Sequence, residues 1–197
     1  MRLTGLQKTL WAAAGLATLA YGAFMVLSDR APLSVAQAAF RPTFALPDAE
    51  GRLRTPADFA GKHMLVFFGF TNCPDVCPTT LSEVAQVMDD LGNDAARVQP
   101  LFISIDPERD RRLGLAEFTT AFHPSILALA GDAAQTRAAA DSFKIFFERE
   151  EDPSAPDGYA MSHSPALYLI GPDGDWLRQF TYGTPAADIL ADLQFRL

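Results

Sequence analysis

Residues 63–78 read HMLVFFGFTNCPDVCP, and this stretch decides the fold. Its first half, His63 to Phe70, is a continuous apolar run of the kind that forms a strand covered on both faces of a sheet. Its second half holds the two cysteines of the chain, Cys73 and Cys77, followed by Pro78, a residue favoured at the start of a helix. The stretch therefore predicts a buried strand that leads through a dithiol loop into a helix.

The segments that follow alternate between strand and helix patterns. The predicted order is two short strands within 44–55, a helical turn at 56–59, strand 63–70, helix 78–92, strand 98–105, helix 113–122, strand 125–131, helix 132–148, a hairpin of 165–170 and 175–180, and a helix from 185. This order predicts a three-layer α/β sandwich whose mixed sheet has a parallel half and an antiparallel half. A strand that delivers a dithiol to the start of a helix is the arrangement of thioredoxin-like folds, and we expect that fold class.

An uncharged stretch near the N-terminus, Leu10 to Leu27 (LWAAAGLATLAYGAFMVL), predicts a transmembrane helix. A helix of this length covers about 27 Å, enough for a thin bilayer core. Arg2 and Lys8 precede it, and positive charge on that side favours a cytoplasmic N-terminus. We therefore expect a single-pass protein of the inner (cytoplasmic) membrane, with its C-terminal domain in the periplasm or an equivalent exoplasmic space.

The expected domain organisation has three parts: an anchor over 1–27, a linker over 28–42 and one thioredoxin-like domain over 43–197. A cleaved signal peptide is the alternative to the anchor, because Ala36-Gln37-Ala38 is an acceptable cleavage motif. Both alternatives export the domain.

The charge of the chain argues against nucleic-acid binding. The formal net charge is -8, and Asp29 is the only acidic residue before residue 42, so the excess of acid lies in the domain. Phosphate contacts need clustered Lys and Arg, which this domain lacks. The acidic run 148–152 (EREED) is either a solvated loop or a docking surface for a partner with a basic face.

The spacing of the cysteines allows three kinds of chemistry. At the carboxyl end of a buried strand, Cys73 and Cys77 occupy the place where open α/β sheets bind ligands. Cys77 is a candidate N-cap of the following helix, whose start favours thiolate over thiol. A redox dithiol and a soft-metal site both need a thiolate, while a structural disulfide is disfavoured because so small a loop gains little from closure.

A third ligand would separate a metal site from a redox pair, and the chain has three histidines. We expect His63 at a surface strand end and His123 in a loop. His163 stands two residues before Pro165, at the entrance to a buried strand, where thioredoxin-like folds face the dithiol. Two thiolates and one imidazole suit copper, and zinc by affinity alone. The residues alone leave the metal site and the redox pair open.

Three motifs, GFTNCPDVCPTTL, ISIDPERD and SHSPALYLIGPDG, resemble the Sco/SenC family of copper-binding proteins. The resemblance implies a membrane-tethered copper metallochaperone that delivers Cu(I) or Cu(II), one ion per chain, to the CuA centre of cytochrome c oxidase subunit II. It implies that Cys73, Cys77 and His163 are the metal ligands. It also places Asp106 where the family has an acid near the site, in a hydrogen-bonding or docking role.

An exported thiol–disulfide oxidoreductase that uses Cys73 and Cys77 is the alternative function. Other copper donors and thiol–disulfide proteins are then expected among the partners. The chain departs from the family pattern at Ser162, where Asp commonly precedes the histidine, and at Gly171. The first departure is expected to alter the hydrogen bonding of His163 and hence its metal affinity.

Overall fold

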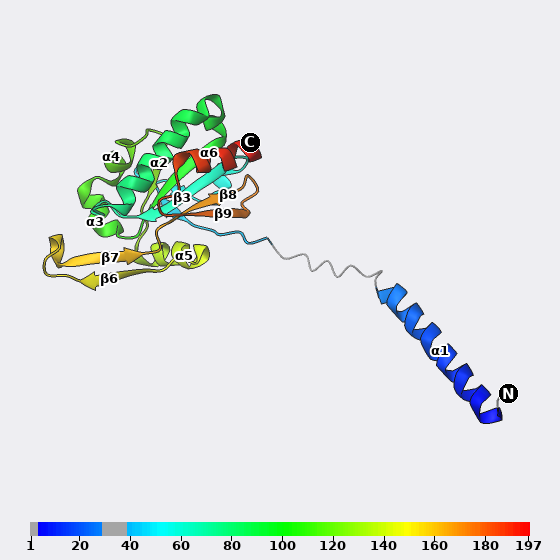
Figure 1. Ribbon diagram of the computed structural model, residues 1–197. Coiled ribbons are helices and arrows are strands. Elements are labelled where there is room, and N and C mark those ends of the chain that lie inside the picture. Colours follow the sequence, from blue (N-terminus) through cyan, green and yellow to red (C-terminus); the bar gives the residue numbers. More distant parts are fainter. Residues whose placement is uncertain (1–3, 29–38) are drawn as a thin grey trace. The chain divides into compact units, whose positions relative to one another are not determined.

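The computed structural model describes residues 4–28 and 39–197 (Figure 1). The chain divides into two units, Met1–Ala38 and Ala39–Leu197, and the first holds helix α1 (Gly5–Ser28). Among the described residues, no helix is both long and apolar enough to cross a membrane. The predicted N-terminal helix is therefore present, whereas the predicted transmembrane span is not confirmed.

Residues 29–38, most of the predicted linker, lie outside the described part of the chain, and so does the candidate cleavage motif at 36–38.

The second unit contains a five-stranded sheet, two small two-stranded sheets and flanking helices. In chain order its elements are β1 (Leu46–Pro47), β2 (Leu53–Arg54), η1 (Pro56–Phe59), β3 (His63–Gly69), α2 (Val76–Leu91), η2 (Gly92–Arg97), β4 (Val98–Ser104), α3 (Pro107–Leu113), α4 (Leu115–Thr120), β5 (Leu127–Leu129), α5 (Ala133–Phe143), β6 (Phe147–Glu151), η3 (Pro156–Gly158), β7 (Tyr159–His163), β8 (Ala166–Ile170), β9 (Trp176–Thr181) and α6 (Ala186–Arg196).

The main sheet has the order β5-β4-β3-β8-β9. Strand β3 lies at its centre, parallel to β4 and antiparallel to β8, so the sheet is mixed as predicted. All seven residues of β3 are buried, as its continuous apolar run requires. The α/β fold with a mixed, thioredoxin-like sheet is confirmed.

Alternate residues of β3 pack on the two faces of the sheet. On one face, the ring of Phe68 lies 5.2 Å from that of Phe143 in α5. On the other, Phe67 packs on Phe102 of β4, which in turn packs on Phe118 of α4. Helices thus cover both faces and make the three layers (Figure 1). The carboxyl end of β3 is left free to carry the dithiol loop.

One predicted helix is too long, and two features of the second unit were not predicted. The helix predicted over 132–148 ends at Phe143, because Lys144 adopts a left-handed conformation with φ 60°. The residues after it form β6, which pairs with β7 in a separate antiparallel ribbon that was not predicted. Helix α3 was also not predicted; Gly114, with φ 79°, separates it from α4.

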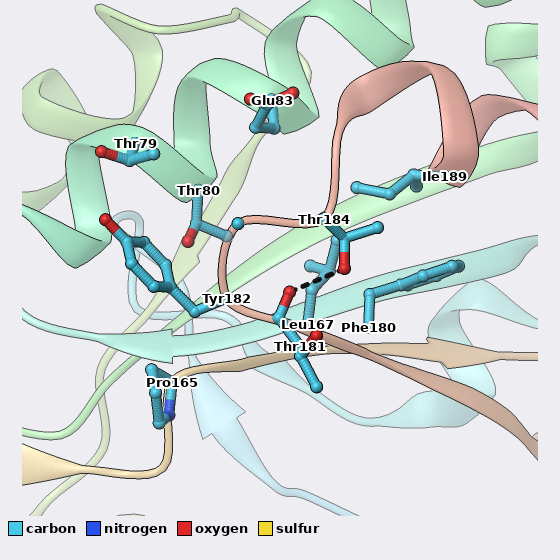
Figure 2. A pocket seen from close by; sticks show the side chains of 11 residues that line it. Thr79, Thr80, Glu83, Pro165, Leu167, Phe180, Thr181, Tyr182, Thr184 and Ile189 are labelled. Carbon is cyan, nitrogen blue, oxygen red and sulfur yellow. Dashed lines mark hydrogen bonds between the residues drawn. The ribbon is translucent and has the colours of Figure 1, made fainter.

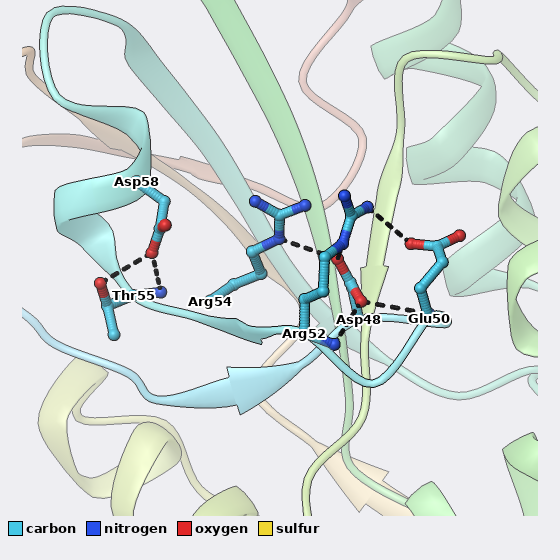
Figure 3. A network of polar contacts seen from close by, with 6 residues as sticks. All are labelled: Asp48, Glu50, Arg52, Arg54, Thr55 and Asp58. Carbon is cyan, nitrogen blue, oxygen red and sulfur yellow. Dashed lines mark hydrogen bonds and ion pairs between the residues drawn. The ribbon is translucent and has the colours of Figure 1, made fainter.

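A buried carboxylate holds the β1–β2 hairpin together (Figure 3). The side chain of Asp48 is 0% exposed and accepts hydrogen bonds from Nε of Arg54 at 2.8 Å and from Nε of Arg52 at 3.1 Å. Its other oxygen accepts the amides of Arg52 and Glu50. Burial acts to raise the pKa of Asp48, but these bonds and the two guanidiniums together lower it below its usual value.

We predict that Asp48→Asn, which removes the charge and keeps the shape, lowers the free energy of unfolding at pH 7 by about 1–3 kcal/mol. Because the folded pKa is depressed, this stability is present above the unfolded pKa near 4 and is lost as the pH falls through the folded pKa. Urea denaturation at pH 7 and at lower pH measures the difference. Asp94→Asn, at an exposed carboxylate whose ion pair is 3.6 Å long, is the control. An equal loss at every pH would contradict the prediction.

Gly69, the last residue of β3, lets helix α2 approach the sheet. A Cβ atom at this position would lie 2.8 Å from Sγ of Cys77 and 3.0 Å from the ring of Phe102. Real Cβ contacts are not this short, so glycine here is a requirement of packing. The buried sulfur of Cys77 occupies the space that a side chain would fill.

We predict that Gly69→Ala displaces the Cys77 sulfur and lowers the free energy of unfolding by about 1–3 kcal/mol, the usual cost of overpacking a core. Chemical denaturation of the reduced protein measures it. Gly171→Ala is the matched control, since its nearest neighbours are movable side-chain atoms of Leu177 at 3.2 Å or more. A loss at Gly69 no larger than that at Gly171 would show that the backbone simply shifts to make room.

Candidate metal centre

The loop after β3 is fixed to the end of β4 by a buried carboxylate. Oδ1 of Asp110 accepts the amide of Thr71 at 3.0 Å and its hydroxyl at 2.8 Å, and Oδ2 accepts the hydroxyl of Ser104 at 2.6 Å. Burial raises the pKa of Asp110 in spite of these bonds. Asp110 therefore joins two parallel strand ends directly below the cysteines.

The sulfur of Cys73 caps helix α2. The helix begins at Val76, two residues earlier than predicted, so Cys77 lies in its first turn and the prediction that Cys77 is the N-cap is wrong. Asp75 is the N-cap, but its side chain makes no capping bond. Instead the amide of Cys77 donates to Sγ of Cys73 at 3.3 Å. Pro78 has no N–H, so it leaves no further donor at that position.

The two thiols differ strongly in acidity. The pKa of Cys73 is lowered to about 4, first by a hydrogen bond from the Cys77 thiol, against the effect of burial, and then by His163 and by the amides of Cys77 and Asp75. The pKa of Cys77 is raised, because its thiol donates to Cys73 and because it is buried. At neutral pH the pair is thus one thiolate and one thiol. Both cysteines are free, so the disulfide that the sequence allows is not formed.

His163 lies at the end of β7 and reaches the thiols from a different sheet. Its imidazole is close enough to Cys73 to be among the groups that lower the pKa of that thiol. Its Nδ1 lies 3.1 Å from the carbonyl oxygen of Ser164. Because a carbonyl can only accept, Nδ1 carries the proton in this contact and Nε2 keeps a lone pair for a metal. The rings of Phe67 and Phe70 meet the imidazole edge-on at 6.0 Å and hold its plane.

A buried arginine that sequence reasoning missed fixes the other end of β7. Arg109 is 1% exposed, and its Nε pairs with Oδ2 of Asp106 at 2.7 Å. The same oxygen accepts the hydroxyl of Tyr159, the first residue of β7, at 2.8 Å. The guanidinium also stacks over the rings of Tyr159 and Phe70, at 4.3 and 5.5 Å. Within the described residues its Nη atoms have no hydrogen-bond partner. In the sequence, the three-residue spacing between Asp106 and Arg109 was the signal that could have indicated this ion pair.

These contacts bear on two expectations about the surroundings of His163, namely the role of Asp106 and the effect of Ser162. Asp106 acts on the ribbon through Arg109 and Tyr159, and its carboxylate is largely buried, so a hydrogen-bonding role is consistent with its position. Ser162, the departure from the family pattern, donates to Glu150 at 2.7 Å on the opposite face of the ribbon. The hydroxyl of Ser162 is thus engaged by Glu150 and not by His163, since alternate strand residues point to opposite faces, and the effect of this departure on metal affinity stays a prediction.

The three predicted ligands meet in pairs, Cys77 with Cys73 and Cys73 with His163. Across the part of the chain that the structure describes, no three His, Cys, Asp or Glu side chains already form a metal-binding group. His123 lies elsewhere and bonds to Ser125 at 2.7 Å. His63 begins β3 at the opposite end of the strand and is 5% exposed, so its predicted surface position is wrong.

The turn between β9 and α6 lies beside the first turns of α2, where Thr80 and Tyr182 line a small cavity (Figure 2). The hydroxyl of Tyr182 donates to Asp75 at 3.3 Å, and Glu83 accepts the amide of Ala186 at 2.6 Å, which ties α2 to the start of α6. The cavity beneath this turn measures about 20 Å³. That is room for a water molecule, not for an organic substrate.

We predict that Cys73 alone reacts rapidly with iodoacetamide at pH 6, because it is already a thiolate when its pKa is about 4. Cys73→Ser should abolish the fast reaction. Cys77→Ser should preserve it but move its pH profile upward, since the Cys77 thiol gives the largest lowering. Alkylation rates from pH 3 to 9, read by mass spectrometry, measure this. A fast reaction whose midpoint stays near the ordinary thiol value, about 8.5, would contradict the assignment.

Comparison with known proteins identifies the family of the chain. A family model described as SCO1/SenC matches residues 34–197. The chain is 41% identical to the mitochondrial SCO2 homolog of Bos taurus over 136 residues, 66% of this chain and 50% of that protein. It is 33% identical to an SCO2-like protein of Rickettsia felis over 151 residues, 77% of this chain and 74% of the relative. The chain thus spans about half the length of the bovine relative.

Solved structures give the same result. Copper-bound ScoI of Bradyrhizobium japonicum superposes with a TM-score of 0.72 at 34% identity, covering 81% of this chain and 100% of that one. Apo Sco1 of Thermus thermophilus gives a TM-score of 0.74 at 34% identity, covering 82% and 94%. The family match spans the dithiol loop, the α3 segment and the histidine ribbon together, and the chain belongs to the SCO1/SenC family.

Proposed function

We propose that this protein binds one copper ion through Cys73, Cys77 and His163 and delivers it to the CuA centre of cytochrome c oxidase subunit II. The observation that carries the proposal is that Cys73, in the loop after the central strand β3, lies close to both the Cys77 thiol and the His163 imidazole. Copper is the cargo of the site.

The donor set fits this ion. Thiolate sulfur is a soft ligand that selects Cu(I), and an imidazole also suits Cu(II). Three protein ligands leave the fourth coordination position open, which suits an ion that must be released. Structural zinc sites, in contrast, have four protein ligands. The copper-bound ScoI of Bradyrhizobium japonicum supports the choice of metal.

Each ligand has a separate part in binding. Cys73 is partly exposed and already ionised, so it is the first donor that an arriving ion meets. Cys77 is buried and protonated, and it must lose its proton to bind. His163 offers Nε2 while Nδ1–H is held by a carbonyl. Copper uptake at neutral pH should therefore release one proton and not two.

We propose that the N-terminal segment directs the chain to a membrane and that the domain functions on the exported side of that membrane. Arg2 and Lys8 flank the start of α1, and large apolar side chains are exposed along the helix, with Trp11 at 71% and Leu19 at 73%. An exposed apolar helix with a basic flank favours contact with lipid. The named bovine relative is mitochondrial, in keeping with an oxidase as the recipient.

Thiol–disulfide exchange is the second candidate, and the unequal acidity of the two cysteines favours it. The Cys73 thiolate would attack a partner disulfide and release one partner thiolate, which takes up a proton. Cys77, once deprotonated, would then displace the second partner thiol and close a Cys73–Cys77 disulfide. The partner gains two electrons and the pair loses two.

We predict that the full reduced chain, titrated anaerobically with Cu(I), takes up one ion and releases one proton at pH 7. Cys73→Ser and Cys77→Ser should abolish tight binding, and His163→Ala should weaken it by at least about tenfold, since ligand loss exceeds the 10–100-fold cost of losing a neighbouring contact. His123→Ala is the matched control. Competition with a chromogenic chelator and a pH indicator give affinity and proton count.

Unchanged copper affinity in His163→Ala would remove histidine from the ligand set. If that variant bound copper weakly yet reduced disulfides within about tenfold of the wild-type rate, the exchange function would stand independently of copper. Weak, non-stoichiometric copper binding by the unmodified chain would overturn the carrier function itself.

A further inference from the structure

A groove beside the metal centre runs between α5, the β6–β7 ribbon and the loop after β4. Its volume is about 590 Å³, and its apolar floor includes Ile105, Phe147 and Met161. Met161 is two residues before His163 on the same strand, and residues two apart on a strand face the same side. The groove therefore opens on the same face of the ribbon as His163.

Two arginines on different elements flank the floor. Arg137 of α5 stacks on the ring of Phe147 at 3.9 Å, and Arg149 of β6 stacks on the ring of Tyr159 at 3.6 Å. Stacking fixes the plane of a guanidinium and leaves its N–H edge available to a carboxylate. Within the described part of the chain neither arginine forms an ion pair, although several other arginines do.

The acidic residues around the groove are mostly occupied. Asp106 is bound by Arg109 and Tyr159, and Asp132 caps α5 by accepting the amide of Gln135. Glu108 is the acid on this lining without such a contact in the described residues. With Asp106 paired to Arg109, the lining carries three arginines, Arg111, Arg137 and Arg149, against the charges of Glu108 and Asp132, on a protein whose net charge is -8. Such a local reversal of charge orients a partner more than it adds general affinity.

We propose that this groove docks an acidic, extended peptide segment of a partner protein, with its carboxylates on Arg137 and Arg149 and an apolar side chain on Phe147 and Met161. Charge complementarity selects the carboxylates, and the apolar floor selects a peptide over a small anion. The inference goes beyond copper binding and stands whether or not the site carries a metal. Within the run 148–152 it assigns docking to Arg149, which lines the groove, and not to the acidic side chains.

The test uses the full chain, reduced and metal-free, with three dye-labelled peptides: acetyl-EEFEE-amide, acetyl-QQFQQ-amide and acetyl-KKFKK-amide. Fluorescence anisotropy should show the acidic peptide binding at least about tenfold more tightly than the glutamine peptide, because charge-assisted bonds are roughly twice as strong as neutral ones. The basic peptide should not bind. Raising the salt concentration from about 0.05 M to about 0.5 M should weaken the binding of the acidic peptide, since exposed charges are screened.

Arg137→Gln and Arg149→Gln should each lower the affinity for the acidic peptide about fivefold or more. Arg97→Gln, at an exposed arginine in η2 with a 3.6 Å ion pair, is the charge-matched control and should change it less than about twofold. Thermal unfolding checks that the variants fold. Equal binding of the acidic and glutamine peptides overturns the proposal without any variant. The proposal is also overturned if the variant with both substitutions, Arg137→Gln and Arg149→Gln, binds the acidic peptide with wild-type affinity. Full competition by free glutamate, or tighter binding of the basic peptide, would overturn it as well.

Discussion

The contact between the amide of Cys77 and the sulfur of Cys73 is the interaction on which the site depends. Helix α2 starts without a side-chain cap from Asp75, and Pro78 supplies no donor, so the Cys73 sulfur is the acceptor at this helix end. The same contact favours the thiolate, since it donates to the charged form. Gly69 makes the approach of the helix possible by leaving room for the second sulfur.

The histidine is positioned by a separate set of contacts. Strand β7 is held at its first residue, Tyr159, by Asp106 and Arg109, and at its last by the aromatic edge around His163. Burying a guanidinium with few hydrogen bonds costs stability, and functional sites are where such costs persist. Phe70 touches both Arg109 and His163, so a single ring joins the arginine to the imidazole.

Local patterns in the sequence were sufficient for most of the fold. The apolar run of β3, the three- and four-residue spacing in α2 and the Gly-Pro-Asp-Gly turn after Ile170 each predict their element correctly. The β6–β7 ribbon was missed, because residues 144–148 continue a helical pattern and only the left-handed Lys144 ends it. That conformation is set by tertiary contacts, not by the propensity of lysine.

The site was predictable in its residues but not in its energetics. Spacing alone names Cys73 and Cys77 as a pair, and the proline after His163 points it toward them. The division into one thiolate and one thiol depends on the hydrogen bond from the Cys77 thiol to Cys73 and on the burial of Cys77, which follows from the packing of α2 on Gly69. The burial of Arg109 was missed, because arginine is seldom fully buried unless paired, and its pairing with Asp106 was indicated only by their three-residue spacing.

The sulfurs and the imidazole belong to different sheets: the dithiol loop follows the main sheet, whereas His163 ends a two-stranded ribbon. A ligand held by both would act as a removable cross-link between them. By mass action, an occupant at a hundred times its dissociation constant would stabilise the docked ribbon by about 2.7 kcal/mol. The loaded and empty forms would then differ in how firmly the ribbon is held against the main sheet.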